Sequence, residues 1–217
     1  MPGMTATPRE AGRVTYSAKI RNLKRNLRMN QRQQDVLIGT ILGDGHLAEN
    51  WSKTHYRLKV GQSVRQAEYV RWKYEMFRDW VLTPPKVHRS TRSLRFATIS
   101  HPDITHFRNM FYQGRKKVLP NNIGALLSPL AVAVWFMDDG NIRKTDNKVY
   151  GYYINTQSFS ERENEALQGI LKKRFGVRAA IYQNNGKPRL YIGAGGKAIF
   201  RSLVQPYILP SLQYKLG

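Results

Sequence analysis

Cysteine is absent from the 217-residue chain. Its absence excludes a disulfide framework, a cysteine-ligated zinc site, an iron–sulfur cluster and a thiol nucleophile. Long apolar runs are absent as well, because the longest candidate, residues 126–137, is interrupted by Ser128 and Pro129. The first 34 residues also lack the apolar centre of a secretory signal. We therefore expect a protein without a membrane span that is soluble, intracellular and not secreted.

Acidic residues are scarce. The chain has 14 Asp and Glu against 36 Lys and Arg, which gives a formal net charge of +22. Such a surplus favours a polyanionic partner, because the summed field of the protein attracts negative charge. Hydrophobic residues still make up 41% of the chain and aromatic residues 11%, which is enough for a core and argues against disorder. The composition indicates a folded, basic protein whose partner is a polyanion.

Two segments repeat one pattern, an apolar run that ends in aspartate and glycine. They read LIGTILGDG (37–45) and VAVWFMDDG (132–140), with Asp44 and Asp139 in matching places. A Gln-Ser pair follows each aspartate at the same spacing, at 62–63 and at 157–158. An unbroken register of this kind indicates a structural repeat. The sequence therefore predicts two pseudo-equivalent halves.

The second helix of each half is expected to begin at a capping box. Ser63 with Gln66, and Ser158 with Glu161, show the required spacing. Apolar residues then recur at helical spacing, which predicts helices that face the core. These residues are Tyr69, Val70, Met76, Phe77 and Trp80 in the first half and Leu167, Ile170, Leu171 and Phe175 in the second.

The strands follow from alternation and turn residues. Residues 55–60 predict a strand, and the Asn-Asn-Gly-Lys segment at 184–187 predicts a hairpin turn. Four further strands are expected at 86–89, 94–98, 178–183 and 189–192. Phe107 and Phe200 are expected to open the terminal helices. Each half then reads helix, two strands, helix, two strands, helix.

The two aspartates come at the ends of apolar helices, where the helix dipole disfavours negative charge by about 0.3–1 kcal/mol. A divalent cation would compensate. Gly39 and Gly43, with Ala131 and Ala133, would let the two helices pack closely and bring the carboxylates together. Paired carboxylates without His or Cys suit Mg²⁺, and this ion supports phosphodiester chemistry. The plainer alternative is a turn in which Gly45 is a left-handed C-cap.

Basic residues alternate with apolar ones on the predicted strands. Residues 55–60 place His55, Arg57 and Lys59 on one face, and no acid lies on these strands. A merely solvated face would use acids as well as bases, so we expect contact with phosphates. The candidate nucleic-acid contacts are His55, Arg57, Lys59, Lys86, His88, Arg95 and Arg189.

With these motifs the chain resembles the single-chain, two-motif LAGLIDADG homing endonucleases. The two apolar runs match the namesake motif, and further matching blocks lie at 82–85, 116–122, 155–159, 206–210 and 214–216. The resemblance implies an α+β fold of two pseudo-twofold-related αββαββα halves whose antiparallel sheets form a DNA-binding saddle. The expected organisation is a basic N-terminal extension (1–33), a first half (34–122) and a second half (123–217).

The resemblance also implies roles for particular residues. Asp44 and Asp139 would be the metal-binding catalytic acids, and the backbone carbonyls of Gly43 and Asp138 would be supplementary metal ligands. Lys117 and Lys215 match the active-site lysines of the family. The implied cofactor is Mg²⁺, for which Mn²⁺ can substitute, and the implied substrate is double-stranded DNA, cut with a stagger.

Other functions remain open on the same fold. The leading alternative is a splicing cofactor that binds intron RNA, and a DNA-binding regulator that does not cut comes third. The presence of both acids and both lysines favours the endonuclease over either binding protein. Arg57 and Lys59 of the first half correspond to the unlike segment 152–154 of the second. We therefore expect a monomer that reads an asymmetric site, since identical halves would require a palindrome.

Overall fold

The computed structural model describes residues 18–146 and 148–217, so the first 17 residues of the expected basic extension lie outside the described residues. The first half contains α3 (Gln31–Leu42), β1 (His46–Glu49), β2 (Tyr56–Ser63), α4 (Ala67–Met76), β3 (Lys86–His88), β4 (Ser93–Ala97) and α5 (Pro102–Phe111). The second half contains α7 (Pro129–Asp139), β7 (Gly140–Thr145), β8 (Lys148–Ile154), α8 (Glu161–Phe175), β9 (Ala180–Asn184), β10 (Lys187–Ile192) and α9 (Ala194–Val204). The expected α+β order is confirmed in both halves.

Shorter elements join and flank the halves. They are α2 (Ala18–Asn26) before the first half, and β5 (Tyr112–Gln113), β6 (Lys116–Lys117) and α6 (Ile123–Leu126) between the halves. Single 3-10 turns lie at Val64–Gln66, Arg78–Trp80, Gln205–Tyr207 and Pro210–Lys215. Across residues 18–146 and 148–217, every helix is too short or too polar to cross a membrane.

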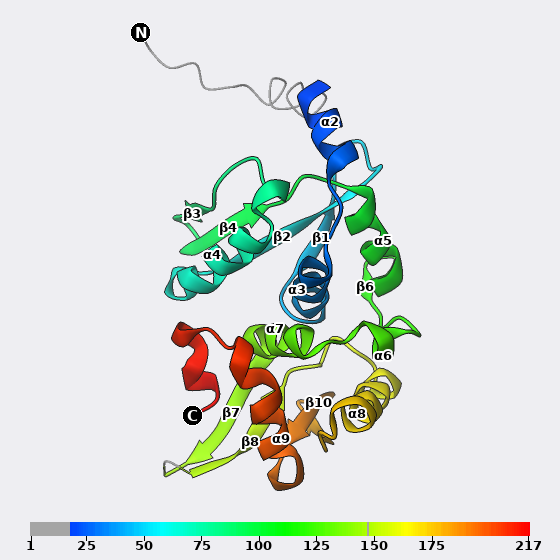
Figure 1. The fold of residues 1–217 in the computed structure, drawn as a ribbon. Coiled ribbons are helices and arrows are strands. Elements are labelled where there is room, and N and C mark those ends of the chain that lie inside the picture. Colours follow the sequence, from blue (N-terminus) through cyan, green and yellow to red (C-terminus); the bar gives the residue numbers. More distant parts are fainter. Residues whose placement is uncertain (1–17, 147) are drawn as a thin grey trace.

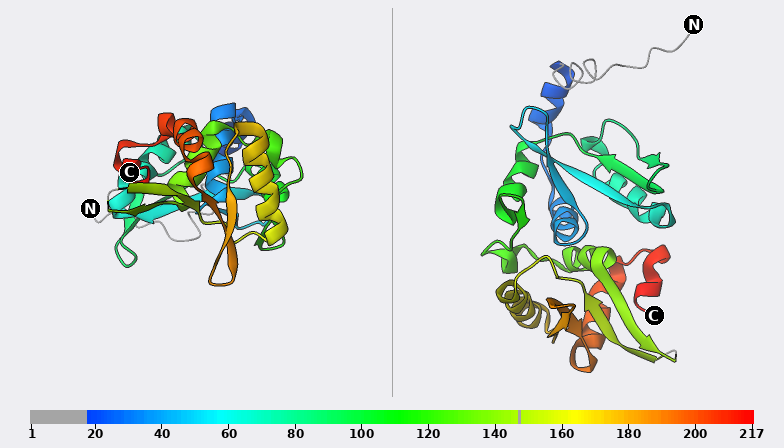
Figure 2. Two further views of the ribbon diagram at one scale, coloured as in Figure 1. Left: turned by 90° about the horizontal axis from the view of Figure 1, so that it is seen from below. Right: turned by 180° about the vertical axis from the view of Figure 1, so that it is seen from behind.

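Each half has one antiparallel four-stranded sheet. The strand orders are β1-β2-β4-β3 and β7-β8-β10-β9. In both sheets the first strand along the chain pairs with the second, and the fourth lies between the second and the third. Each sheet turns its apolar face to the helices: Leu58, Val60 and Phe96 are buried on the first sheet, and Ile154 and Leu190 on the second. Figures 1 and 2 show α3 and α7 side by side between the two halves. The pseudo-symmetry expected from the repeat is therefore present in the backbone.

The contact between α3 and α7 depends on small residues. A Cβ atom on Gly39 would lie 2.4 Å from the carbonyl oxygen of Ala131, and one on Gly43 would lie 2.4 Å from Cβ of Asp138. Neither position has room for a side chain, so the expectation of close helix packing is confirmed. Both helices are capped at their N-termini, by Asn30 and by Ser128. The C-terminal ends of the two helices lie next to each other, because Gly43 and Asp138 are in close contact.

Two predicted helix starts are wrong. Ser63 accepts a hydrogen bond from the backbone N–H of Arg65 and caps a 3-10 turn, so α4 begins only at Ala67. In the second half the capping box is formed by Ser160 and Glu163, two residues later than expected. Spacing alone could not choose between these overlapping Ser/Glu pairs, since both satisfy the same pattern.

Three further local predictions need correction. Phe107 and Phe200 lie inside α5 and α9 and do not open these helices. Gly45 does not have a positive φ. Its N–H donates to the carbonyl of Thr40 over 2.7 Å, and a Cβ at this position would come within 2.4 Å of that oxygen. Glycine is needed there for close backbone approach and not for a left-handed cap.

The second-half hairpin was predicted correctly. Asn185 and Gly186 have φ values of 52° and 72° between β9 and β10. Positive φ at both central residues gives a turn whose twist matches the flanking strands. The looser first-half pair, β3 and β4, is also confirmed.

Candidate active site and nucleic-acid interface

The ends of α3 and α7 bring three carboxylates into one neighbourhood. Asp44 follows the last turn of α3 and is exposed, whereas Asp138 and Asp139 end α7. Gln62 lies at the inner end of β2, the end next to the C-termini of α3 and α7. Its Nε2 group donates to Asp44 Oδ2 over 2.9 Å and lies 3.5 Å from Asp138 Oδ1. The amide thus links the first-half acid to the second-half helix.

Asp139 has an unusual protonation equilibrium. Burial, reinforced by the charges of Asp44 and Asp138, raises its pKa to about 7, while Lys117 and Lys215 act in the opposite direction. Neighbouring carboxylates resist simultaneous ionisation in a poorly solvated site. A cation between them would relieve this repulsion.

Each of the two predicted active-site lysines lies at the end of one of the two helices. Lys117 Nζ on β6 donates to the carbonyl oxygen of Gly43 over 2.6 Å. Lys215 Nζ donates to the carbonyl oxygens of Met137 at 2.5 Å and Asp138 at 3.2 Å. Each ammonium therefore lies at the negative end of one helix dipole. Burial lowers the pKa of both lysines, although the nearby aspartates favour their charged forms.

Sequence reasoning missed a buried ion pair in the same place. Lys73 Nζ on α4 lies 2.9 Å from both carboxylate oxygens of Asp138, and the two side chains are 1% and 0% exposed. The ammonium also lies 4.4 Å from the ring centroid of Tyr69, whose hydroxyl donates to the carbonyl of Val134 over 3.2 Å. The available signal was a lysine four residues after Tyr69 on an otherwise apolar helix face.

The donor set suits a hard divalent cation. Within the described ranges, no group of three or more His, Cys, Asp or Glu side chains could hold a metal by itself. Asp138 is already paired with Lys73, which leaves Asp44 and Asp139 as available carboxylates. Mg²⁺ commonly takes one or two protein carboxylates and completes its shell with water and substrate phosphates. The residues present therefore fit such an ion, completed by a phosphodiester.

The open face of the first sheet collects the predicted basic residues. Strand pairing sets Lys59 opposite His46 and Arg95 opposite both Gly61 and Lys86. All six first-half candidates line one groove of about 1120 Å³, together with Asp44. They are His55, Arg57, Lys59, Lys86, His88 and Arg95. The groove thus runs from the acid along the cationic face.

The open face of the second sheet is chemically different. The Arg189 guanidinium lies 3.8 Å from the ring centroid of Tyr153, and Arg143 lies 5.4 Å from that of Tyr191. Tyr153 and Tyr182 pack against Tyr191 with centroid distances of 4.9 and 5.1 Å. Sequence reasoning found Arg189 but missed this tyrosine cluster.

The expectation for segment 152–154 needs a correction at the same sheet. Tyr152 and Ile154 are fully buried in the core, so only Tyr153 belongs to the open face. The adjacent tyrosines concealed this alternation, because either one could have been the inward residue.

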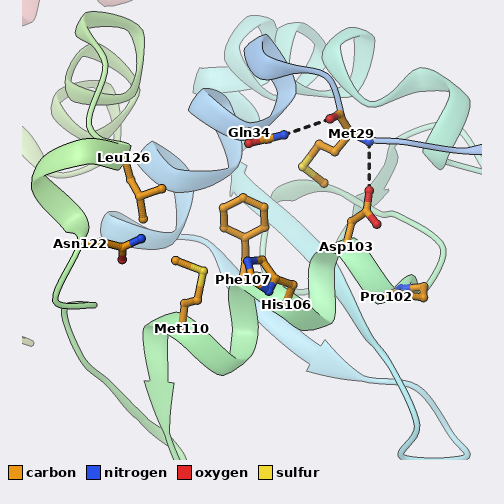
Figure 3. Close-up of a pocket in the computed structure, with 9 residues that line it drawn as sticks. All are labelled: Met29, Gln34, Pro102, Asp103, His106, Phe107, Met110, Asn122 and Leu126. Carbon is orange, nitrogen blue, oxygen red and sulfur yellow. Dashed lines mark hydrogen bonds between the residues drawn. The ribbon is translucent and has the colours of Figure 1, made fainter.

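A second hollow, shown in Figure 3, lies away from the acids. Its volume is about 490 Å³, and its lining comes from α5, α6 and the start of α3. Phe107, Met110 and Leu126 make much of this lining apolar. Asp103, the one carboxylate among the described residues of this lining, accepts the backbone N–H of Met29 at 3.0 Å. This hollow therefore brings together no groups for the chemistry of the aspartates.

Residues 34–200 match the profile of the LAGLIDADG DNA endonuclease family. The chain belongs to this family. It is 30% identical over 196 residues to a probable intron-encoded endonuclease 1 of Wickerhamomyces canadensis, covering 85% of this chain and 83% of that protein. Its fold matches the homing endonuclease I-WcaI, solved bound to its DNA recognition sequence, with a TM-score of 0.84, 26% identity and 93% coverage of both chains.

More distant relatives carry other names. The chain is 24% identical over 204 residues to a cytochrome b mRNA maturase of Debaryomyces hansenii, covering 88% of this chain and 76% of that protein. The fold also resembles I-DmoI, solved in complex with DNA and Mn, with a TM-score of 0.53, 14% identity and coverage of 82% of this chain and 99% of that one. At this identity the I-DmoI likeness supports the fold alone.

Proposed function

We propose that this member of the LAGLIDADG family is an intron-encoded homing endonuclease that makes a staggered double-strand break at a long, asymmetric DNA site. The observation that carries the proposal is the meeting of Asp44 and Asp139 beside the buried Lys215 and the partly buried Lys117, at the inner end of an almost acid-free cationic groove. The two open sheet faces would form the saddle that lies along the DNA major groove. A single chain would supply both halves of this surface.

Asp44 and Asp139 would hold the divalent cation, Mg²⁺ in the first place, for which Mn²⁺ would substitute. When bound, such an ion stabilises the charge that builds up on phosphorus and on the leaving oxygen, and it lowers the pKa of water. A divalent metal is in keeping with I-DmoI, which shares this fold and was solved in complex with DNA and Mn. The carbonyls of Gly43 and Asp138 would complete the shell only after releasing Lys117 and Lys215.

The protein's own groups would then position the reactants. Lys117 and Lys215 would orient the attacking water or polarise a phosphate oxygen, because fixed ammonium groups stabilise developing negative charge in a poorly hydrated site. Gln62 would hold the Asp44 carboxylate in one orientation. Arg57, Lys59 and the other cations of the first groove would neutralise the DNA backbone.

The proposal is tested with a plasmid that carries the uninterrupted host-gene site. Incubation with the protein and Mg²⁺ should give linear DNA with staggered ends, and a chelator should prevent the reaction. Failure to cut at every temperature tried, with a folded protein, would contradict the proposal.

A splicing cofactor that binds intron RNA is the second candidate, and the similarity to a cytochrome b mRNA maturase favours it. A binder of this kind would have no chemical need for both Asp44 and Asp139. Binding measurements that compare the parent intron RNA with the DNA site separate the candidates. Tighter, selective binding to RNA without DNA cleavage would reverse their order.

A further inference from the structure

The cationic groove continues past the first sheet. Its lining begins with Asp44 at the inner end of the sheet and reaches Arg21 and Lys24 on α2. The stretch of β2 from Tyr56 to Gln62 separates these ends by about 20 Å at the usual rise of a strand. Figure 1 shows α2 beyond the outer end of the first sheet, far from α7.

Helix α2 is held firmly against the first half. Ile20 is 5% exposed, and Lys24 Nζ donates to the Ser100 hydroxyl over 3.1 Å. The His101 ring accepts the backbone N–H of Asp103 at Nδ1, so its Nε2 carries the proton and donates to the carbonyl of Lys24 over 2.8 Å. These contacts fix both the side and the end of the helix.

The connection from α2 to α3 is fixed as well, as Figure 3 shows. Met29 is buried, its N–H donates to Asp103 Oδ2 over 3.0 Å, and its carbonyl accepts from Gln34 Nε2 over 3.1 Å. The helix therefore stands at a defined place before any partner arrives. Binding there would not require the ordering of a free segment, which reduces the entropic cost.

The charge and exposure of this end of the groove indicate its partner. Helix α2 contains no acid, and among the described residues that line the groove Asp44 is the one acid. Trp51, in the loop between β1 and β2, lines the same end and is 93% exposed. A row of cations on a fixed helix that contains no acid is typical of a surface that meets a nucleic-acid backbone.

We propose that Arg21 and Lys24 form an outer phosphate-binding surface for double-stranded DNA, which contacts the backbone just beyond the base pairs covered by the first sheet. This inference rests on the proposed function, since it assumes that the duplex lies along the groove. Helix α2 precedes α3 in the first half, whereas α7 of the second half is preceded by β5, β6 and α6 of the linker. The surface therefore lengthens the contact with DNA on one side of the site.

The test compares two pairs of substitutions on and beside α2. Arg21→Gln/Lys24→Gln removes the cations that line the groove, whereas Arg25→Gln/Arg28→Gln removes exposed cations that do not line it. Affinity for a long duplex containing the site is measured against salt without divalent metal. The Arg21→Gln/Lys24→Gln variant, the groove pair, should show a salt slope, the slope of log affinity against log salt concentration, that is smaller in magnitude by about 2. Its binding should be weaker by ~5-fold per lost contact at 0.15 M salt. The control pair should leave both unchanged.

Two further arms keep the inference separate from the proposed function. Shortening the duplex on the side of the first half should lower the DNA affinity of the wild type to that of the groove pair. It should leave the affinity of the groove pair unchanged. Arg21→Gln alone, which spares the Lys24–Ser100 contact, should lower the slope by about 1. Equal slopes for wild type and both pairs, with unchanged thermal melting, would overturn the inference. An α2-dependent slope in a protein that binds but does not cut would support it while contradicting the endonuclease.

Discussion

The two halves share a backbone topology but differ in the electrostatics of their aspartates. In the first half a glycine precedes Asp44, which is exposed and bonded to Gln62. In the second, Asp138 precedes Asp139, which is partly buried with its pKa raised to about 7. Each half contributes one helix to the shared contact and has the same sheet pairing, whereas the charged groups around the two aspartates differ. Matching positions therefore need not be chemically equivalent.

The open sheet faces differ in the same way. The first presents cations along a groove, and the second presents tyrosines covered by Arg143 and Arg189. Cations act mainly on phosphates, while aromatic surfaces add contacts that depend little on salt. We expect each half to bind its half-site by different chemistry.

The largest expected effect tests whether both aspartates are essential. Asp44→Asn or Asp139→Asn should reduce double-strand cleavage below about a hundredth of wild type, because each removes charge that a metal needs. DNA affinity without metal should change little, since the basic face remains. Quantitative plasmid cleavage and filter binding give both values. Residual cutting above that level in both variants would count against two essential acids.

The next effect concerns the ion pair present in only one half. Lys73→Met should lower the free energy of unfolding by about 3–5 kcal/mol, because the Asp138 carboxylate is left buried without its ammonium partner. Lys73→Met/Asp138→Asn should recover much of the loss. Chemical denaturation measures the differences, and the exposed Lys172→Met serves as a control with a change near zero. A small effect for Lys73→Met would show that the pair is not a structural link.

The raised pKa of Asp139 predicts a pH dependence in metal-free protein. Between its unfolded pKa of about 3.9 and its folded pKa of about 7, the folded state binds more protons, so this contribution to stability falls as pH rises. The loss is at most about 4 kcal/mol, and Asp44, Asp138, Lys117 and Lys215 all face this carboxylate. Asp139→Asn should flatten the profile measured with a chelator present. A variant as steep as wild type would assign the slope elsewhere.

The smallest effects compare the open faces. Lys59→Gln should lower the salt slope of DNA binding by about 1, since one phosphate contact is lost. Tyr191→Leu should weaken binding by roughly 1 kcal/mol through loss of ring contacts and leave the slope unchanged. Titrations at several salt concentrations provide the comparison. The same slope change in both variants would remove the proposed distinction between the faces.

Sequence reasoning succeeded where a local pattern determines the outcome. The repeated apolar run and its small residues predicted the helix contact. Lys117 and Lys215 were predicted from the family resemblance and not from a local pattern, and the charges of Asp44 and Asp139 act on both. Sequence reasoning failed where the decisive partner is distant in sequence. Lys73 is stable inside the core only because Asp138 comes from the other half, and no spacing rule encodes that contact.

Light scattering of the DNA complex, combined with sequencing of sites cut from a random library in Mg²⁺, is the most direct test. Two unlike halves in one chain predict one protein molecule per duplex, staggered ends and a consensus without twofold symmetry. Two molecules per duplex with a palindromic consensus would contradict the account.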